Sequence, residues 1–191
     1  MRKIVLDIET KNTFRDVGSS DARMLDISLL VAYDSQTETY YSYLEDEFSG
    51  LWKLLEAADM IIGYNSDHFD IPLLDKYYPG NLHQIKSLDL LKEIEKSIGK
   101  KVRLDAVADG TLGKKKSGNG LEAIDWWKAG EIEKIRKYCE DDVRITKEVY
   151  EYALKNKTLK YRDFSGVHSF PIDTTDWEKK DSASVNFTLP F

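Results

Sequence analysis

An eight-residue segment near the start of the chain, Lys3–Thr10, constrains the fold more than any other part of the sequence. It opens with a run of β-branched and aliphatic residues, which is typical of a strand buried on both faces of a sheet. Asp7 and Glu9 follow two residues apart, and because side chains alternate along a strand, both carboxylates point to the same side. Two such charges repel each other and favour a divalent cation as counter-charge; alternatively, the strand ends here and both carboxylates lie in water.

The overall composition narrows the class of protein. At 191 residues we expect one domain over 1–173 and a tail over 174–191 that packs on it. A formal net charge of −6 argues against a protein that coats nucleic acid, but not against an enzyme that holds a few phosphates with the help of metal ions. The single cysteine, Cys139, excludes an intramolecular disulfide and indicates a reducing compartment. No apolar run approaches the roughly 18 residues of a membrane span, and no signal peptide precedes the first strand, so we expect a cytoplasmic protein.

The apolar periodicity alternates between strand and helix spacing along the rest of the chain. Strands are expected over 24–33, 37–44, 60–63, 85–88, 159–163 and 167–172. Helices are expected over 46–58, 89–98, 104–112, 121–128 and 131–155, with one more beginning near Pro72. Residues 11–22, 64–70 and 114–120 are expected to be loops. These elements predict a layered α/β or α+β domain.

The long helix expected over 131–155 carries two adjacent aspartates. At about 100° per residue, Asp142 lies about 60° from Cys139, at the edge of the stripe expected to face the sheet. Tyr138 lies one turn earlier on the same edge, whereas Asp141 points roughly 160° away, toward solvent. Asp142 is therefore a candidate site residue and Asp141 a surface charge. The alternative for Asp142 is an aspartate at the rim, paired with a lysine.

Asp70 is the remaining candidate carboxylate. It follows a buried strand and a polar loop and lies just before Pro72. Its alternative role is to cap the N-terminus of the helix that begins there, which is common for aspartate.

Three segments of the chain resemble the motifs of the DEDD 3′–5′ exonuclease superfamily. They are Asp-Ile-Glu-Thr at 7–10, Gly-Tyr-Asn-Ser-Asp-His-Phe-Asp-Ile-Pro-Leu-Leu at 63–74, and Tyr-Cys-Glu-Asp-Asp-Val at 138–143. The third is a Tyr-x-x-x-Asp pattern and therefore resembles the tyrosine (DEDDy) branch, which includes proofreading domains of B-family DNA polymerases. The segments 87–91, 104–108 and 113–118 resemble stand-alone bacterial RNase H-like domains of the YprB type. The resemblance spans about residues 3–172 and implies an RNase H-like fold, with a central mixed sheet whose first three strands are antiparallel and whose later strands are parallel.

The resemblance also implies a mechanism with two metal ions, Mg²⁺ or Mn²⁺, which prefer oxygen ligands. Asp7 would bridge both ions, Glu9 and Asp142 would complete the site of one, and Asp70 would hold the other. Two ions about 3.5–4 Å apart stabilise the attacking and leaving oxygens of a phosphodiester displacement. Tyr138 would orient the attacking water, because a phenol with an ordinary pKa near 10 is a poor base at pH 7.

Other residues match positions that contact the 3′-terminal nucleotides in the family. These are Thr10, Asn65 and Phe69; their alternative roles are a strand end, a turn and core packing, respectively. An aromatic face can stack on a base without reading its sequence. Lys114, Lys115 and Lys116 form the densest basic run of the chain, and we interpret them as a phosphate-binding loop rather than only a solvated one.

The function expected from the sequence is a metal-dependent 3′–5′ exonuclease that shortens single-stranded nucleic acid and releases nucleoside 5′-monophosphates. DNA is favoured over RNA as substrate. Two alternatives stay open: a non-catalytic nucleic-acid-binding accessory module, and a structure-specific endonuclease that uses the same metal centre. The sequence contains no helicase or polymerase segment, so we expect the protein to act alone or with such a partner in trans. It does not define the oligomeric state.

Overall fold

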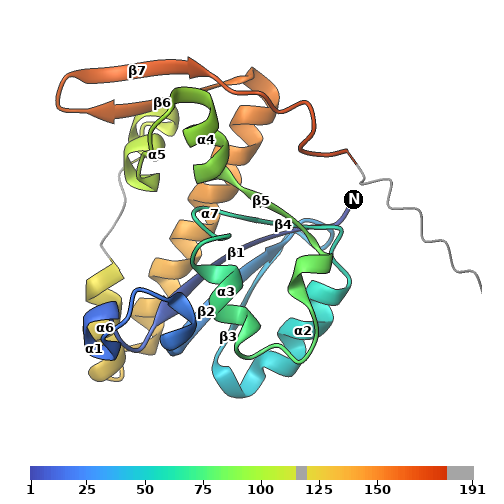
Figure 1. Cartoon of the computed structure of the whole chain (residues 1–191), viewed down its shortest axis with the longest axis vertical. Coiled ribbons are helices and arrows are strands. Elements are labelled where there is room, and N and C mark those ends of the chain that lie inside the picture. Colours follow the sequence, from blue (N-terminus) through green and yellow to red (C-terminus); the bar gives the residue numbers. More distant parts are fainter. Residues whose placement is uncertain (115–119, 180–191) are drawn as a thin grey trace, which may run out of the picture.

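The computed structural model describes residues 1–114 and 120–179, which form a five-stranded sheet flanked by helices and a separate hairpin (Figure 1). The sheet strands are β1 (Lys3–Thr10), β2 (Ile27–Asp34), β3 (Thr39–Tyr43), β4 (Met60–Gly63) and β5 (Lys86–Asp89); the hairpin strands are β6 (Thr158–Asp163) and β7 (Gly166–Pro171). The α-helices are α1 (Phe14–Val17), α2 (Phe48–Glu56), α3 (Asp70–Asp75), α4 (Leu90–Ile98), α5 (Leu104–Leu112), α6 (Gly120–Lys128) and α7 (Ile132–Asn156). Short 3₁₀ turns span Ala22–Met24, Glu45–Glu47 and Leu82–Gln84.

Strand β1 lies in the middle of the sheet, whose order is β3-β2-β1-β4-β5. It pairs antiparallel with β2, which pairs antiparallel with β3. On its other side it pairs parallel with β4, and β4 pairs parallel with β5. The predicted mixed sheet, with three antiparallel strands followed by parallel ones, is therefore confirmed.

The apolar residues of β1 contribute to two separate cores, one on each face of the sheet. Val5 packs into the core that α7 covers, through residues such as Cys139 and Val143. Ile4 and Leu6 pack into the opposite core, which α2 and α3 cover. This alternation is the burial on both faces expected of the first strand.

Several element boundaries differ from those predicted. The strand expected from Met24 begins at Ile27, because 22–24 form a 3₁₀ turn whose N-terminus Asp21 caps. The loop expected over 11–22 contains helix α1, which begins with a capping box formed by Thr13 and Asp16. Such short elements depend on side-chain to backbone hydrogen bonds, which apolar periodicity does not report.

The end of the described chain packs on α4 and α7. Trp177 is buried, stacks on Tyr150 with ring centroids 5.8 Å apart, and donates from Nε1 to Glu93 at 3.0 Å. The predicted tail extends beyond Lys179, and its remaining residues, 180–191, lie outside the described ones. Among the residues that the structure does describe, no helix combines the length and apolar character needed to cross a membrane.

Helix α5 holds the β6–β7 hairpin, which lies at the top of Figure 1, through very close backbone contact. The Thr111 hydroxyl donates to the Lys160 carbonyl at 2.6 Å and accepts from the Lys160 amide at 2.9 Å. Gly110 faces Tyr161, where an added Cβ would lie only 2.5 Å from the backbone carbonyl carbon.

Replacing Gly110 with alanine is therefore expected to destabilise the fold. The added methyl group must push β6 away from α5, which we expect to lower the free energy of unfolding by about 1–3 kcal/mol. Without this contact the substitution would instead raise the free energy of unfolding, because alanine stabilises a helix interior relative to glycine by up to about 1 kcal/mol. Thermal and urea unfolding measure the change, and an increased melting temperature would contradict the close packing.

Candidate active site

The carboxylates selected from the sequence come together at the C-terminal end of β1. They line one cavity of about 450 Å³ together with Tyr138. The contributing elements are far apart in the sequence: β1 supplies Asp7 and Glu9, α3 supplies Asp70, and α7 supplies Tyr138 and Asp142. The structure thus brings together all five residues predicted to be catalytic.

Asp7 and Glu9 lie on the same side of β1, against α7. One side-chain oxygen of each and the Cys139 sulfur all lie within 4.8 Å of one another. The Cys139 thiol donates to the Asp7 carbonyl oxygen at 3.2 Å, and its Sγ lies 3.6 Å from Asp7 Oδ2. Burial, followed by the charge of Asp7, raises the pKa of the Cys139 thiol, so Cys139 packs here as a neutral group. The strand end is not a solvated pair of charges, since Glu9 is only 7% exposed.

Asp70 is almost fully buried, at 3% exposure, and it is the first residue of α3. Burial raises its pKa well above the usual range, and the nearby charge of Asp7 adds to that effect. Its Oδ1 has no hydrogen-bond partner among the described residues. The N-cap position belongs to Phe69, so the capping role considered for Asp70 is wrong, and the helix begins two residues before Pro72.

Helix α7 separates its two aspartates as the helical geometry predicts. Asp142 is 3% exposed and lines the cavity, so it is not a rim residue. Asp141 pairs with Arg144 at 2.7 Å and does not line the cavity. Tyr138 is also buried, and Trp126 on α6 packs against it edge-on, with ring centroids 5.9 Å apart. Tyr138 therefore forms part of the cavity wall and packs against α6.

These side chains fit a divalent cation. A buried carboxylate such as Asp70 is unfavourable beside another carboxylate unless a positive charge compensates, and Oδ1 of Asp70 has a lone pair unused by the described protein groups. Four carboxylates supply hard oxygen donors, as Mg²⁺ and Mn²⁺ prefer. The one soft donor nearby, Cys139, is a buried neutral thiol. The arrangement therefore suits an oxygen-preferring ion.

The three residues expected to contact nucleotides also line the cavity. Thr10 ends β1 and donates its hydroxyl to the Asn12 carbonyl at 2.8 Å. Asn65 has a left-handed backbone, with φ of 65°, and thus forms a turn as well. Phe69 is half-buried: it packs partly into the core and also lines the cavity.

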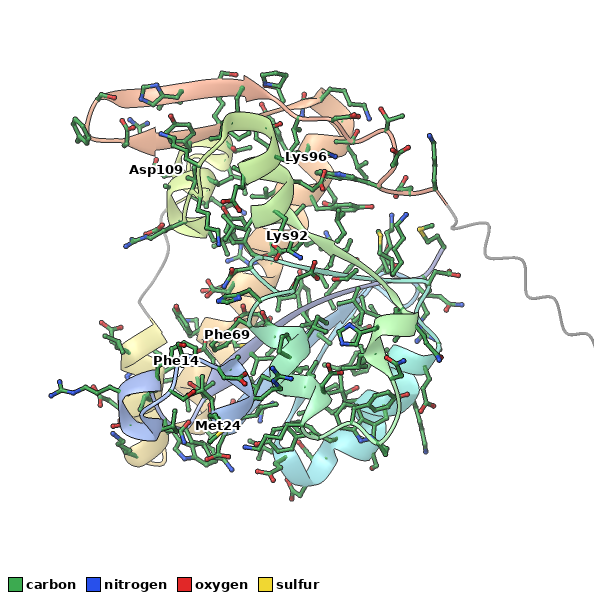
Figure 2. The ribbon with its side chains drawn as sticks, viewed as in Figure 1. Phe14, Met24, Phe69, Lys92, Lys96 and Asp109 are labelled. Carbon is green, nitrogen blue, oxygen red and sulfur yellow. The ribbon has the colours of Figure 1, made fainter. Side chains whose placement is uncertain are left out.

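The cavity has an apolar wall that the sequence did not reveal. Phe14 on α1 meets Phe69 edge-on, with ring centroids 6.0 Å apart, and Figure 2 shows the two rings next to each other. Leu121 on α6 lines the cavity and is 67% exposed. The sequence pattern that could have predicted α1 is the capping box of Thr13 and Asp16. The apolar pattern gave no indication that Leu121 lines a cavity.

Asp89 lies in the segment 87–91, for which the sequence indicated a resemblance but no role, and the structure shows how this residue shapes the site. Its carboxylate accepts hydrogen bonds from the amides of Asn65 at 2.8 Å, Leu91 at 2.9 Å and Asp67 at 3.2 Å. It therefore caps α4 and at the same time holds the loop that carries Asn65.

The predicted lysine loop lies only partly within the described residues. Lys114 bonds Glu148 on α7, with its ammonium 2.7 Å from Oε1, and it does not line the cavity. Lys115 and Lys116 lie outside the described residues.

Comparison with known proteins places these observations in a family. In fold, the chain is similar to the family B DNA polymerase of the hyperthermophilic archaeon Pyrobaculum calidifontis, with a TM-score of 0.62 at 20% identity, over 81% of this chain and 24% of the polymerase. It is also similar to Trypanosoma brucei RNase D, with a TM-score of 0.60 at 15% identity, over 81% of this chain and 58% of that protein. The chain thus spans about a quarter of the polymerase and less than two thirds of RNase D. No curated protein matches it in sequence. Residues 4–154 match the family described as the RNase H superfamily, and the chain belongs to that superfamily.

Proposed function

We propose that the protein is a metal-dependent 3′–5′ exonuclease of the tyrosine DEDD branch, similar to YprB-type domains, that acts on single-stranded ends. The observation that carries the proposal is the convergence of Asp7, Glu9, Asp70, Asp142 and Tyr138 in one cavity. The fold similarity to a DNA polymerase and to RNase D supports a nuclease, and we favour DNA as substrate.

The proposed roles are those that the resemblance to the DEDD family implies, and the chemistry of each side chain suits them. Asp7, Glu9, Asp70 and Asp142 hold two Mg²⁺ or Mn²⁺ ions. Such ions, when bound, supply Lewis-acid stabilisation of the charge that develops on the attacking and leaving oxygens of a phosphodiester. Tyr138 orients the attacking water by hydrogen bonding from the wall of the cavity. Thr10, Asn65 and Phe69 position the terminal nucleotide, and Phe14 packs behind Phe69.

The size of the cavity supports action at an end of a single strand. About 450 Å³ lies in the range in which proteins hold one small ligand, roughly 300–1,000 Å³, so the cavity is large enough for one terminal nucleotide. The apolar wall of Phe14, Phe69 and Leu121 offers faces against which a base can stack.

Incubation of a 5′-labelled single-stranded oligonucleotide with the protein and Mg²⁺ or Mn²⁺ tests the proposal. We expect a ladder of products shortened from the 3′ end, none in the presence of EDTA, and release of nucleoside 5′-monophosphates. A closed circular strand is expected to stay intact, because it has no end; its cleavage would instead support the endonuclease alternative. Binding without metal-dependent turnover would support the accessory-module alternative.

Replacing Tyr138 with phenylalanine removes only the hydroxyl proposed to orient the water. We expect kcat to fall by about 100-fold, the lower end of the effect of removing one positioned hydrogen-bonding group, while circular dichroism shows that the variant is folded. Tyr152→Phe, on the same helix away from the cavity, is the matched control. Equal kcat values for the two variants would show that the phenol has no role in the reaction.

A further inference from the structure

A second cavity adjoins the candidate active site. Tyr64 and Asn65 line both cavities, so these two residues form the wall between them. The second cavity has a volume of about 290 Å³, and its far side is formed by Leu91 and the segment 101–104, which leads into α5. A polymer that extends from the active site past Asn65 therefore meets this segment next.

The wall between the cavities is held in place by hydrogen bonds. The Tyr64 hydroxyl donates to the carbonyl oxygen of Val102 at 2.5 Å. Burial, followed by the charge of Asp89, raises the pKa of Tyr64, so this hydroxyl stays a donor. The Asn65 amide donates to Asp89 at 2.8 Å. The segment 101–103 is thus tied directly to the residues that line the active site.

Two cations lie on the solvent side of this segment. Val102 is buried, whereas Lys101 and Arg103 on either side of it are exposed. Arg103 has an extended backbone, with φ of −72° and ψ of 151°. Because side chains alternate along an extended segment, the buried valine anchors it while both cations face the cavity and the water beyond.

The charges around the cavity leave both cations accessible to a phosphate. Lys101 has no ion pair among the described residues. Arg103 pairs with Asp105 through Nε, at 3.1 Å, and through Nη2, and this guanidinium is 85% exposed. Ion pairs between exposed groups contribute little to stability, so a phosphate can replace Asp105 as the partner of Arg103. Arginine and lysine are also the usual ligands of phosphate groups.

We propose that Lys101 and Arg103 bind the backbone phosphates of the nucleotides upstream of the 3′ end, so that the substrate strand leaves the active site over Asn65 and enters the second cavity. Leu91 and Leu104 give this cavity an apolar side for the base or sugar. The inference rests on the proposed function, because it takes the first cavity to hold the 3′ end. It gives a protein of net charge −6 a local contact for an anionic polymer.

Measurement of oligonucleotide binding tests the proposal without relying on turnover. The double variant Lys101→Ala/Arg103→Ala is combined with Asp7→Asn, and fluorescence anisotropy follows labelled oligothymidylates of two and twelve nucleotides over a range of salt concentrations. Lys53→Ala/Lys155→Ala in the same background changes the net charge equally at exposed positions away from both cavities. Lys101→Arg/Arg103→Lys retains both charges.

For the twelve-nucleotide probe, the plot of log Kd against log salt is expected to become shallower by about 1.4, or about 0.7 for each lost phosphate contact. Taking equal binding at 1 M salt, this corresponds to about 25-fold weaker binding at 0.1 M salt. The control pair and the charge-retaining pair are expected to behave like the parent. For the dinucleotide, which we expect not to reach beyond Asn65, the difference in Kd between the double variant and the parent is expected to be smaller.

Equal salt dependence for the double variant and the control pair, or no binding by the parent, would overturn the proposed path. If the double variant has the expected shallower slope but the wild-type protein shortens no oligonucleotide, the path stands and the exonuclease proposal fails. If the wild-type protein is active and the slopes are equal, the exonuclease proposal stands and the path fails.

Discussion

Replacement of Asp7 with asparagine is expected to abolish nuclease activity, lowering kcat by roughly 10³-fold or more. Asp7 lies close to two other acidic groups: one of its side-chain oxygens is within 4.8 Å of a Glu9 oxygen, and its negative charge helps raise the pKa of buried Asp70. Asparagine keeps the shape of the side chain but removes the negative charge that we propose binds the cations. Time courses with the labelled oligonucleotide in Mn²⁺ and in Mg²⁺ measure the change.

The matched control is Asp141→Asn, the same chemical change on α7 one residue before Asp142. Asp141 pairs with Arg144 and lies outside the cavity, so this variant is expected to retain full activity. Circular dichroism should show that both variants are folded. Substantial activity in Asp7→Asn, or an equal loss in Asp141→Asn, would show that the acidic cavity is not the catalytic centre.

The contrast between these two aspartates also shows what the sequence could predict. An α-helix has a fixed angle per residue, so counting from Cys139 was enough to place Asp142 in the cavity and Asp141 outside it. Strand alternation in the same way placed Asp7 and Glu9 together. Because helices and strands have a fixed periodicity, the spacing of residues in the sequence predicts which side chains share a face.

Features that depend on tertiary contact could not be predicted in this way. Asp70 looked like a helix cap because local sequence alone does not show that a neighbouring strand brings Asp7 close to it. Phe14 belongs to a helix of only four residues, which begins with capping hydrogen bonds. Its ring contacts Phe69, which is distant in sequence. Tyr64 joins Val102 across 38 positions of the chain, which no local pattern encodes.

Neutralising Asp70 is expected to stabilise the metal-free protein while it removes activity. In the folded state Asp70 is buried beside Asp7 and its pKa is raised, whereas in the unfolded chain it has an ordinary value near about 3.9. The folded protein therefore holds a proton that the unfolded chain has lost, so the free energy of unfolding of the metal-free wild type falls as the pH rises from about 4 through the raised folded pKa. Asp70→Asn removes this loss of stability at high pH. Its free energy of unfolding is expected to exceed that of the wild type by about 1–2 kcal/mol at pH 8 in EDTA, in line with the usual trade-off between stability and activity.

Divalent cations are expected to make the wild type more stable than Asp70→Asn, the reverse of the order of stability in EDTA. Saturating Mn²⁺ stabilises the wild type through binding to the folded state, so its melting temperature should rise with metal concentration, and Asp70→Asn should respond much less. Asp46→Asn, an exposed aspartate on the short turn before α2, should melt like the wild type with and without metal. Thermal unfolding of the three proteins in EDTA and in Mn²⁺, from pH 5 to pH 8, measures both effects. If Asp70→Asn were less stable than the wild type in EDTA, the buried carboxylates would be stabilised by protein contacts alone, and the cavity would not need a metal ion to balance its charge.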